Sequence, residues 1–140
     1  VQRYLARVSG PLLDRIDMHI EVPPLKHDEL LEKKVGESSA SIAARVMAAR
    51  LAQRERFEKV PGVYANAHLK AAEIQRFCTV PSAADALLRQ AITKLGLSAR
   101  AYHRVLKIAR TIADLESRST IASDDVAEAI QYRSIDRLVR

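Results

Sequence analysis

The strongest periodic pattern in the chain covers residues 98–115. Apolar side chains recur there at helical spacing, at Tyr102, Val105, Leu106, Ala109, Ile112 and Ala113. A second side of the same helix carries the basic residues Arg100, His103, Arg104, Lys107 and Arg110. Ser98 can cap this helix, because its hydroxyl can accept a hydrogen bond from a free first-turn amide. The pattern predicts a helix that packs on one side and presents a basic face on the other.

Similar stripes predict helices before and after this one. A long helix capped by Ser38 or Ser39 is expected to reach about Glu58, with the apolar stripe Ile42, Ala43, Val46, Met47 and Leu51. Further helices are expected over residues 70–78, from a cap at Ser82, and from a cap at Ser123. Residues 38–132 should therefore fold as a helical bundle, with a core built from Ile42, Val46, Leu87, Leu88, Ile92, Leu95, Val105, Leu106, Ile112 and Ile130.

The pattern changes over residues 16–22, where apolar and polar side chains alternate without interruption. Strict alternation predicts a strand that is buried on one face, and the two prolines that follow would end it. A single strand has no partner for its backbone groups, so we expect its sheet to lie upstream. In isolation, residues 1–24 should be poorly ordered or should borrow a partner.

Composition supports a helical domain but does not decide whether the domain binds nucleic acid or a nucleotide. Of the 140 residues, 48% are hydrophobic and none is tryptophan, while glycine and proline are few; this favours packed helices over a β-sandwich or barrel. Lys and Arg outnumber Asp and Glu by 23 to 17, a net charge of +6. That charge permits contact with nucleic acid or nucleotide phosphates, but a plain solvated basic surface would carry it equally well.

Location and completeness are also expectations from the sequence. No apolar run approaches the roughly 20 residues that span a bilayer, and no signal peptide opens the chain. We therefore expect a cytoplasmic protein with no membrane partner. The sequence starts at Val1 rather than at a methionine, which suggests an excised piece of a longer protein.

Familiar catalytic motifs are absent from the sequence. It contains no Gly-rich phosphate loop, no HExxH or CxxC motif and no Gly-x-Ser-x-Gly elbow. The four histidines lack metal-ligand spacing, so no metal site is predicted. Cys78 is the single cysteine, which excludes an internal disulfide. The chain by itself should not be an enzyme.

Two arginines remain as candidates for a functional role. Arg100 lies early in its predicted helix, where the helix dipole disfavours a cation and favours an anion; it is well placed to meet a phosphate. Arg15 lies just before the predicted strand. Each has a simpler alternative: Arg15 could pair with Asp14 or Asp17 on a surface, and Arg100 could be an ordinary exposed helix residue.

Four separated segments, residues 9–17, 36–40, 96–115 and 129–136, resemble the C-terminal part of the magnesium-chelatase-like AAA+ ATPases of the ComM/YifB type. The resemblance implies a mostly α fold. Residues 38–140 would form a helical lid domain and residues 25–37 a linker. Residues 1–24 would be the tail of the α/β ATPase core, with the arginine-finger segment and an edge strand.

The resemblance also implies roles for the two arginines. Arg15 matches the arginine finger that reaches the nucleotide of a neighbouring subunit, a catalytic role. Arg100 matches the second-sensor arginine of the lid, which contacts the cofactor. The full-length protein would use ATP and magnesium, assemble as a homo-oligomeric ring and act on DNA. The Walker A, Walker B and first-sensor segments would lie before Val1, so the fragment alone should bind no cofactor and be inactive.

Three functions remain in view. The first is the lid region of a DNA helicase or motor of the ComM competence type. The second is the ATPase subunit of a magnesium chelatase, which inserts magnesium into a porphyrin; the segment 131–134 favours the ComM type over it. The third is a stand-alone DNA-binding module that places helix 98–115 in a groove. The apolar stripe of that helix argues against the third, because it leaves only part of the surface for DNA.

Overall fold

The computed structural model describes residues 15–24, 36–95 and 97–133. Across these ranges the regular secondary structure is helical and no strand is formed. In chain order its elements are α4 (Ser39–Arg56), the 3-10 turn η1 (Asn66–His68), α5 (Ala71–Phe77), α6 (Ser82–Leu95), α7 (Ala99–Leu115) and α8 (Ser123–Gln131). The predicted mostly α fold is confirmed.

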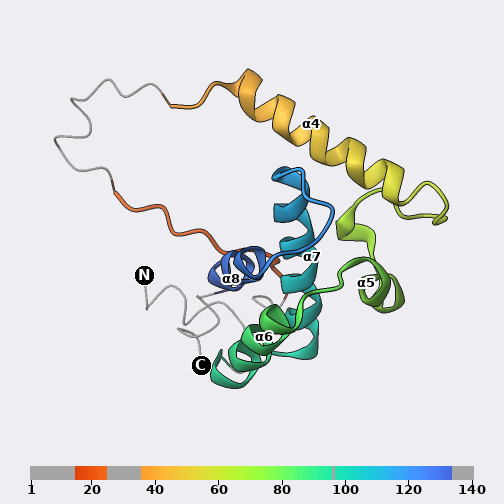
Figure 1. The fold of residues 1–140 in the computed structure, drawn as a ribbon. Coiled ribbons are helices and arrows are strands. Elements are labelled where there is room, and N and C mark those ends of the chain that lie inside the picture. The colour runs from red at the N-terminus through yellow and green to blue at the C-terminus, as the bar shows by residue number, and fades with distance from the viewer. Residues whose placement is uncertain (1–14, 25–35, 96, 134–140) are drawn as a thin grey trace.

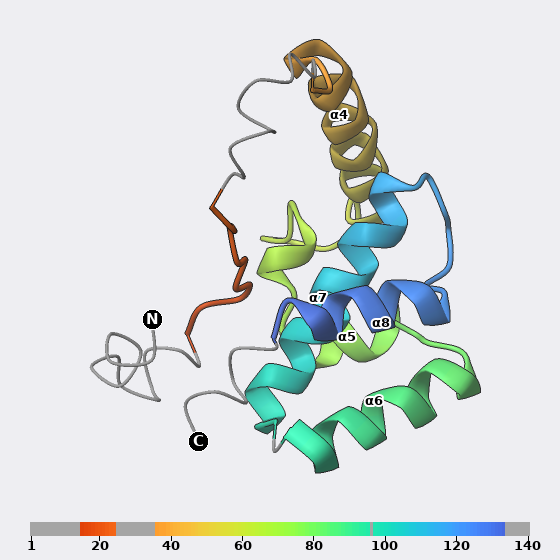
Figure 2. The ribbon, with the colours of Figure 1, turned by 90° about the vertical axis from the view of Figure 1, so that its left-hand side faces the viewer.

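Helix α7 lies at the centre of the domain, where it contacts α4, η1, α5 and α8, while α6 packs against α8 (Figures 1 and 2). The apolar stripe predicted for α7 is the reason: Val105, Leu106, Ala109 and Ala113 are buried. Leu88 and Val126 join them from α6 and α8. Burying a valine or leucine side chain contributes about 1.5–3 kcal/mol relative to exposure, so the stripe of α7 is a main source of stability.

The predicted core is right for the later helices. Leu88, Val105 and Leu106 are buried, and partly buried side chains pack against them at Leu87, Ile92, Ile112 and Ile130. The side chain of Leu95 lies outside the described residues.

Helix starts were predicted with mixed success. The hydroxyls of Ser38 and Ser98 each accept a hydrogen bond from the amide three residues later, at 3.2 Å, so these caps are confirmed. The caps predicted at Ser82 and Ser123 are wrong, since both residues already lie inside their helices. In α8, the Asp125 carboxylate instead accepts from the amide of Ala122 at 2.8 Å. An acidic side chain in the first turn also suits the positive end of the helix dipole.

Helix α4 contradicts the predicted core. Its apolar stripe is exposed, by 42% at Ile42, 43% at Val46, 67% at Met47 and 57% at Leu51. Within α4 the buried residues are Ala49 and Gln53, near its C-terminal end. Figure 1 shows the first half of α4 extending past the bundle. The expectation that Ile42 and Val46 belong to the core is therefore wrong, because an apolar stripe identifies a face and does not supply the surface that covers it.

The edge strand predicted over Ile16–Val22 is not formed. Residues 15–24 have no regular secondary structure, since no strand lies beside them within the described part of the chain. The amide of His19 instead donates to the carbonyl of Tyr132 at 2.8 Å. Figure 1 shows the segment starting beside α7 and α8 and then leading away from the bundle. The apolar side chains follow this path, from 40% exposed at Met18 to 83% at Val22.

This attachment corrects, for residues 16–19 alone, the expectation that residues 1–24 would be poorly ordered or need a partner. Residues 16–19 are held by the helical domain itself. Residues 1–14 of the proposed core tail, and residues 25–35 of the proposed linker, lie outside the described ranges.

Candidate functional site

Arg15, the predicted finger, is exposed at the start of the described N-terminal segment. The surface pair considered for it with Asp17 is not formed. Asp17 pairs instead with Arg104 of α7, with 2.9 Å between Oδ1 and Nε, and Asp14 lies outside the described residues. No ion pair links Arg15 to another described residue. Its guanidinium, which is always charged, is therefore available to a partner.

Arg100, the predicted second sensor, is the second residue of α7 and is also exposed. It too makes no ion pair within the described part of the chain. An arginine near a helix N-terminus gains nothing from the dipole, whereas a bound anion would benefit from both charges. The two predicted arginines lie on different elements, and neither lines the pocket described below.

Three other residues of the predicted basic face of α7, Arg104, Lys107 and Arg110, make contacts inside the domain. The Arg104 side chain is only 16% exposed in its pair with Asp17. The Lys107 ammonium donates to the carbonyl of Ala67 at 2.8 Å, and Arg110 is 2% exposed. The basic face predicted for α7 is therefore engaged within the domain at these three positions, while Arg100 stays exposed.

A buried polar cluster, which the sequence analysis missed, joins α4, η1 and α7 around Asp114. Arg56 donates to both Asp114 oxygens, to Oδ2 at 2.9 Å. The Asn66 amide donates to Oδ2 at 2.8 Å and Arg110 Nε to Oδ1 at 3.1 Å. Arg110 also donates to the carbonyls of Arg118 and Ser119, at 2.5 and 2.8 Å. The cluster fixes the C-terminal end of α4 against α7.

The charge state of Asp114 follows from this cluster. Burial alone would raise its pKa, but the hydrogen bonds from Arg56 and Asn66 hold the pKa of the carboxyl below its ordinary value. The signal in the sequence was Asp114 four residues after Arg110, a spacing that places both on one helix face. Arg56 could not be linked to it, because it lies 58 positions earlier.

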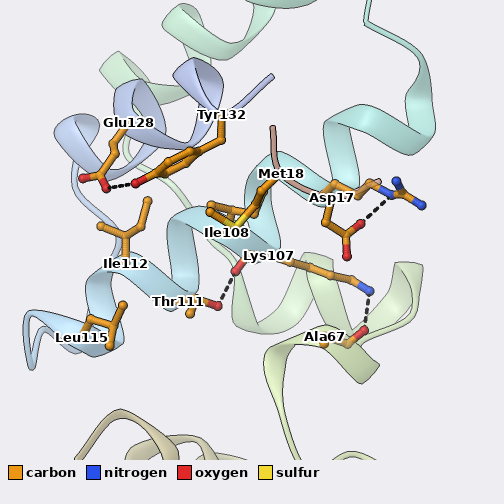
Figure 3. Close-up of a pocket in the computed structure, with 11 residues that line it drawn as sticks. Asp17, Met18, Ala67, Lys107, Ile108, Thr111, Ile112, Leu115, Glu128 and Tyr132 are labelled. Carbon is orange, nitrogen blue, oxygen red and sulfur yellow. Dashed lines mark hydrogen bonds and ion pairs between the residues drawn. The ribbon is translucent and has the colours of Figure 1, made fainter. Parts of the chain in front are cut away.

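A pocket of about 320 Å³ opens between residues 17–18, α7 and α8 (Figure 3). Met18, Ile108, Ile112 and Leu115 supply its apolar wall. Its polar groups are engaged with each other or with the backbone. The Tyr132 hydroxyl donates to Glu128 at 2.9 Å, which raises the pKa of Tyr132. Met18 forms part of its wall, and we interpret the pocket as the place where residues 17–18 pack against α7 and α8.

Other candidate chemistry is not supported. Burial raises the pKa of the Cys78 thiol to about 11, so this cysteine is no thiolate nucleophile at neutral pH. Residues 15–24, 36–95 and 97–133 contain no group of three or more His, Cys, Asp or Glu side chains placed to hold a metal ion. Within the same ranges, no helix has the length and hydropathy to cross a membrane.

Three of the four segments singled out in the sequence meet in space. Asp17, in the first, pairs with Arg104, in the third. Tyr132 and Arg133, in the last, bind the backbone of His19 and Ile16. The contacts surround the few residues that follow Arg15.

Comparison with known proteins matches these segments to one family. Residues 36–133 match "Magnesium chelatase, subunit ChlI C-terminal", and residues 1–30 match "Magnesium chelatase, subunit ChlI". The chain is 44% identical over its full length to "Competence protein ComM" of Haemophilus influenzae. It is 46% identical over 98% of its length to "Uncharacterized protein YifB" of Escherichia coli, and 35% identical over 94% to an uncharacterized protein of Mycobacterium tuberculosis. It spans about a quarter of these relatives, 27%, 26% and 26% of their lengths respectively.

Proposed function

The chain belongs to the magnesium chelatase ChlI family, and from that membership we propose that it forms the C-terminal lid region of a magnesium-chelatase-like AAA+ ATPase. The full-length protein is an oligomeric DNA helicase or motor of the competence type. This region contributes Arg15 as the arginine finger and Arg100 as the sensor-2 arginine. The observation that supports these roles most directly is that both side chains are exposed and make no ion pair with another described residue.

The two arginines fit a nucleotide by their chemistry. A guanidinium presents a planar fork of donors that matches phosphate oxygens, and it stays charged at any physiological pH. Bound ATP with magnesium supplies the phosphoryl group that is transferred to water. Arg100 holds the nucleotide of its own subunit, since lid and core belong to one chain. Arg15 projects toward the nucleotide of the neighbouring subunit.

The finger role is expected to contribute most to the rate. Charge spreads over the equatorial oxygens of the transferred group in the transition state, and an arginine finger is worth roughly 10³–10⁵ in turnover. Arg15 has no carboxylate partner among the described residues that would compete for it. It can therefore engage a phosphate of another subunit without first breaking an internal ion pair.

DNA is the proposed substrate of the motor. One relative is named for competence, and we extend that role to the protein to which this chain belongs, acting on branched or single-stranded DNA. The net charge of +6 supports contact with a polyanion. Exposed arginines on α4, Arg50 and Arg54, add to this charge on the surface.

Magnesium chelation is the second candidate, and the family description itself favours it. In that case the same lid would serve an ATPase subunit that drives insertion of magnesium into a porphyrin. The two candidates share the roles of Arg15 and Arg100 and differ in what the hydrolysis drives. Identity of 44% to the competence protein over the whole chain leads us to prefer the DNA motor.

The test uses the full-length protein. Its ATP hydrolysis should rise on addition of branched or single-stranded DNA, and it should separate the strands of a labelled branched DNA when ATP is present. Arg89→Ala is the control, because Arg89 is an exposed arginine on α6 that pairs with Asp85, and this variant should hydrolyse ATP normally. Hydrolysis that ignores DNA but drives magnesium insertion into a porphyrin would favour the chelatase. A full-length protein that hydrolyses no ATP would contradict both.

A further inference from the structure

The residues that directly follow Arg15 are held by the helical domain at consecutive positions. We name residues 15–19 the finger segment. The buried guanidinium of Arg133 donates to the carbonyl of Ile16, Asp17 pairs with Arg104, and Met18 lines the pocket between α7 and α8 (Figure 3). The amide of His19 donates to the carbonyl of Tyr132.

These contacts limit where Arg15 can go. The anchored carbonyl belongs to the residue next to Arg15, and one residue of extended chain spans at most about 3.3–3.6 Å. Arg133 is 0% exposed, so its charged donor is fixed by the surrounding protein rather than by solvent. The backbone at Arg15 is therefore tied to the end of α8, although its side chain remains exposed.

The pair between Arg104 and Asp17 connects the finger segment to α7. Arg104 is 16% exposed, whereas Asp17 is 65% exposed. A pair with one exposed partner adds little stability. Loss of Asp17 would nonetheless leave a largely buried guanidinium without its ion pair, and Arg104 Nη1 already lacks a hydrogen-bond partner among the described residues. The contact is better suited to orienting the segment than to stabilising the fold.

Arg104 also lies one helical turn after Arg100, so the two share a face of α7. A shift or rotation of α7 that brings Arg100 onto a phosphate would move Arg104, and with it Asp17. The same helix therefore carries the predicted sensor and the attachment of the predicted finger.

We propose that Arg104 and Arg133 are positioning residues for Arg15, and that α7 transmits occupancy of the subunit's own nucleotide site to the finger that serves the neighbour. This inference rests on the proposed function. It adds that the helical domain determines the placement of the finger and is not only a cover for the nucleotide.

The kinetic test uses Arg104→Gln and Asp17→Asn in the full-length protein. A misplaced catalytic group costs up to about 100-fold, so each variant should lower kcat by about 10-fold to 100-fold. KM for ATP should change by less than about 2-fold, because a transition-state contact is weakened and substrate binding is not. The exchanged pair Arg104→Asp with Asp17→Arg should recover part of the loss. Arg89→Gln is the matched control, since it removes an exposed ion pair with Asp85 on α6.

A second measurement follows the finger segment without relying on hydrolysis. The amide of His19 should be protected from hydrogen exchange in the full-length protein, and Arg104→Gln should reduce that protection. A non-hydrolysable ATP analogue should increase protection in the wild type and should leave Arg100→Ala unchanged. No change in exchange in either comparison would overturn the inference.

The outcomes separate this inference from the proposed function. If Arg15→Ala abolishes turnover while Arg104→Gln and Asp17→Asn keep the wild-type kcat, the positioning role is wrong and the finger role stands. If Arg15→Ala turns over at the wild-type rate, the finger role is wrong and no finger remains to be positioned. Hydrogen exchange at His19 would still report in that case whether α7 holds the segment.

Discussion

In the first half of α7, Arg100 is exposed and Arg104 pairs with Asp17, whereas in the second half Arg110 is buried against Asp114. The helix thus uses one residue type in two environments. The basic side chains of its first half face the finger segment and solvent, whereas Arg110 in its second half lies beside α4 and the loop before α8. Charge pattern alone does not distinguish the two, because what surrounds each arginine is set by elements far away in the sequence.

The difference predicts which substitutions should affect folding and which should affect nucleotide chemistry. Removing a charged side chain from the second half of α7 should lower the free energy of unfolding. Removing a basic side chain from the first half should leave it nearly constant and act on binding or turnover.

The largest loss of stability is expected for Asp114→Asn. This change leaves Arg56 and Arg110 without their shared carboxylate, and breaking a buried ion pair typically costs about 3–5 kcal/mol. Urea denaturation followed by circular dichroism would measure the cost. A matched change at an exposed pair, Asp85→Asn, should cost about 0–1 kcal/mol. Equal losses of unfolding free energy at the two sites would show that the buried cluster stabilises the fold no more than an exposed ion pair does.

The same carboxylate makes stability depend on pH. Its folded pKa is lowered, so its contribution is fully present above the unfolded value, about 3.9, and is lost as pH falls through the folded pKa. Wild-type stability should therefore fall on acidification more steeply than that of Asp114→Asn. Parallel pH profiles from pH 6 down to acid unfolding would contradict this assignment.

Leu106→Ala truncates a buried side chain of α7. Its loss of stability should be no larger than that of Asp114→Asn. Such changes cost about 2–5 kcal/mol, according to the cavity that remains. Leu51→Ala on α4 is the matched control, because Leu51 is 57% exposed, and it should stay within about 0.5 kcal/mol. A cost below about 1 kcal/mol at Leu106 would mean that α7 packs with another face.

The smallest effect on folding is expected for Arg100→Ala. This exposed residue has no ion-pair partner within the described ranges. The free energy of unfolding should therefore change by no more than about 0.5 kcal/mol. In the full-length protein the same change should weaken ATP binding and turnover together, which equilibrium binding of a fluorescent nucleotide would measure. Normal nucleotide affinity in a folded Arg100→Ala protein would remove the sensor role.

Much of the helical domain could be predicted from local patterns. The stripe of α7 and the cap at Ser98 were correct because both depend on neighbours within a turn or two. The stripe on α4 was read correctly as apolar, but its burial was not predictable, since a covering surface must come from elsewhere. The strand over Ile16–Val22 failed for the same reason: alternation indicates a strand only where a second strand can pair with it.

The candidate site, too, has a part that local sequence could predict and a part that it could not. Arg15 and Arg100 were selected from their sequence context, and both are exposed; their roles stay predictions. The attachment of the finger segment was not predictable, because Ile16 and Arg133 lie 117 positions apart. Burial of Arg110 was missed, because Arg56, which shares the carboxylate of Asp114 with it, belongs to a helix far from α7 in the sequence.

The central claim is that Arg15 acts on the nucleotide of a neighbouring subunit, and mixed rings of the full-length protein test it most directly. Subunits carrying Arg15→Ala would be mixed with subunits that lack their own phosphate-binding lysine, each inactive alone. Some ATP hydrolysis should return, because an intact nucleotide site can then face an intact finger. With Arg100→Ala in place of Arg15→Ala, none should return at interfaces between the two mutants. Equal behaviour of the two mixtures would contradict the assignment of Arg15 as a finger that acts across the subunit interface.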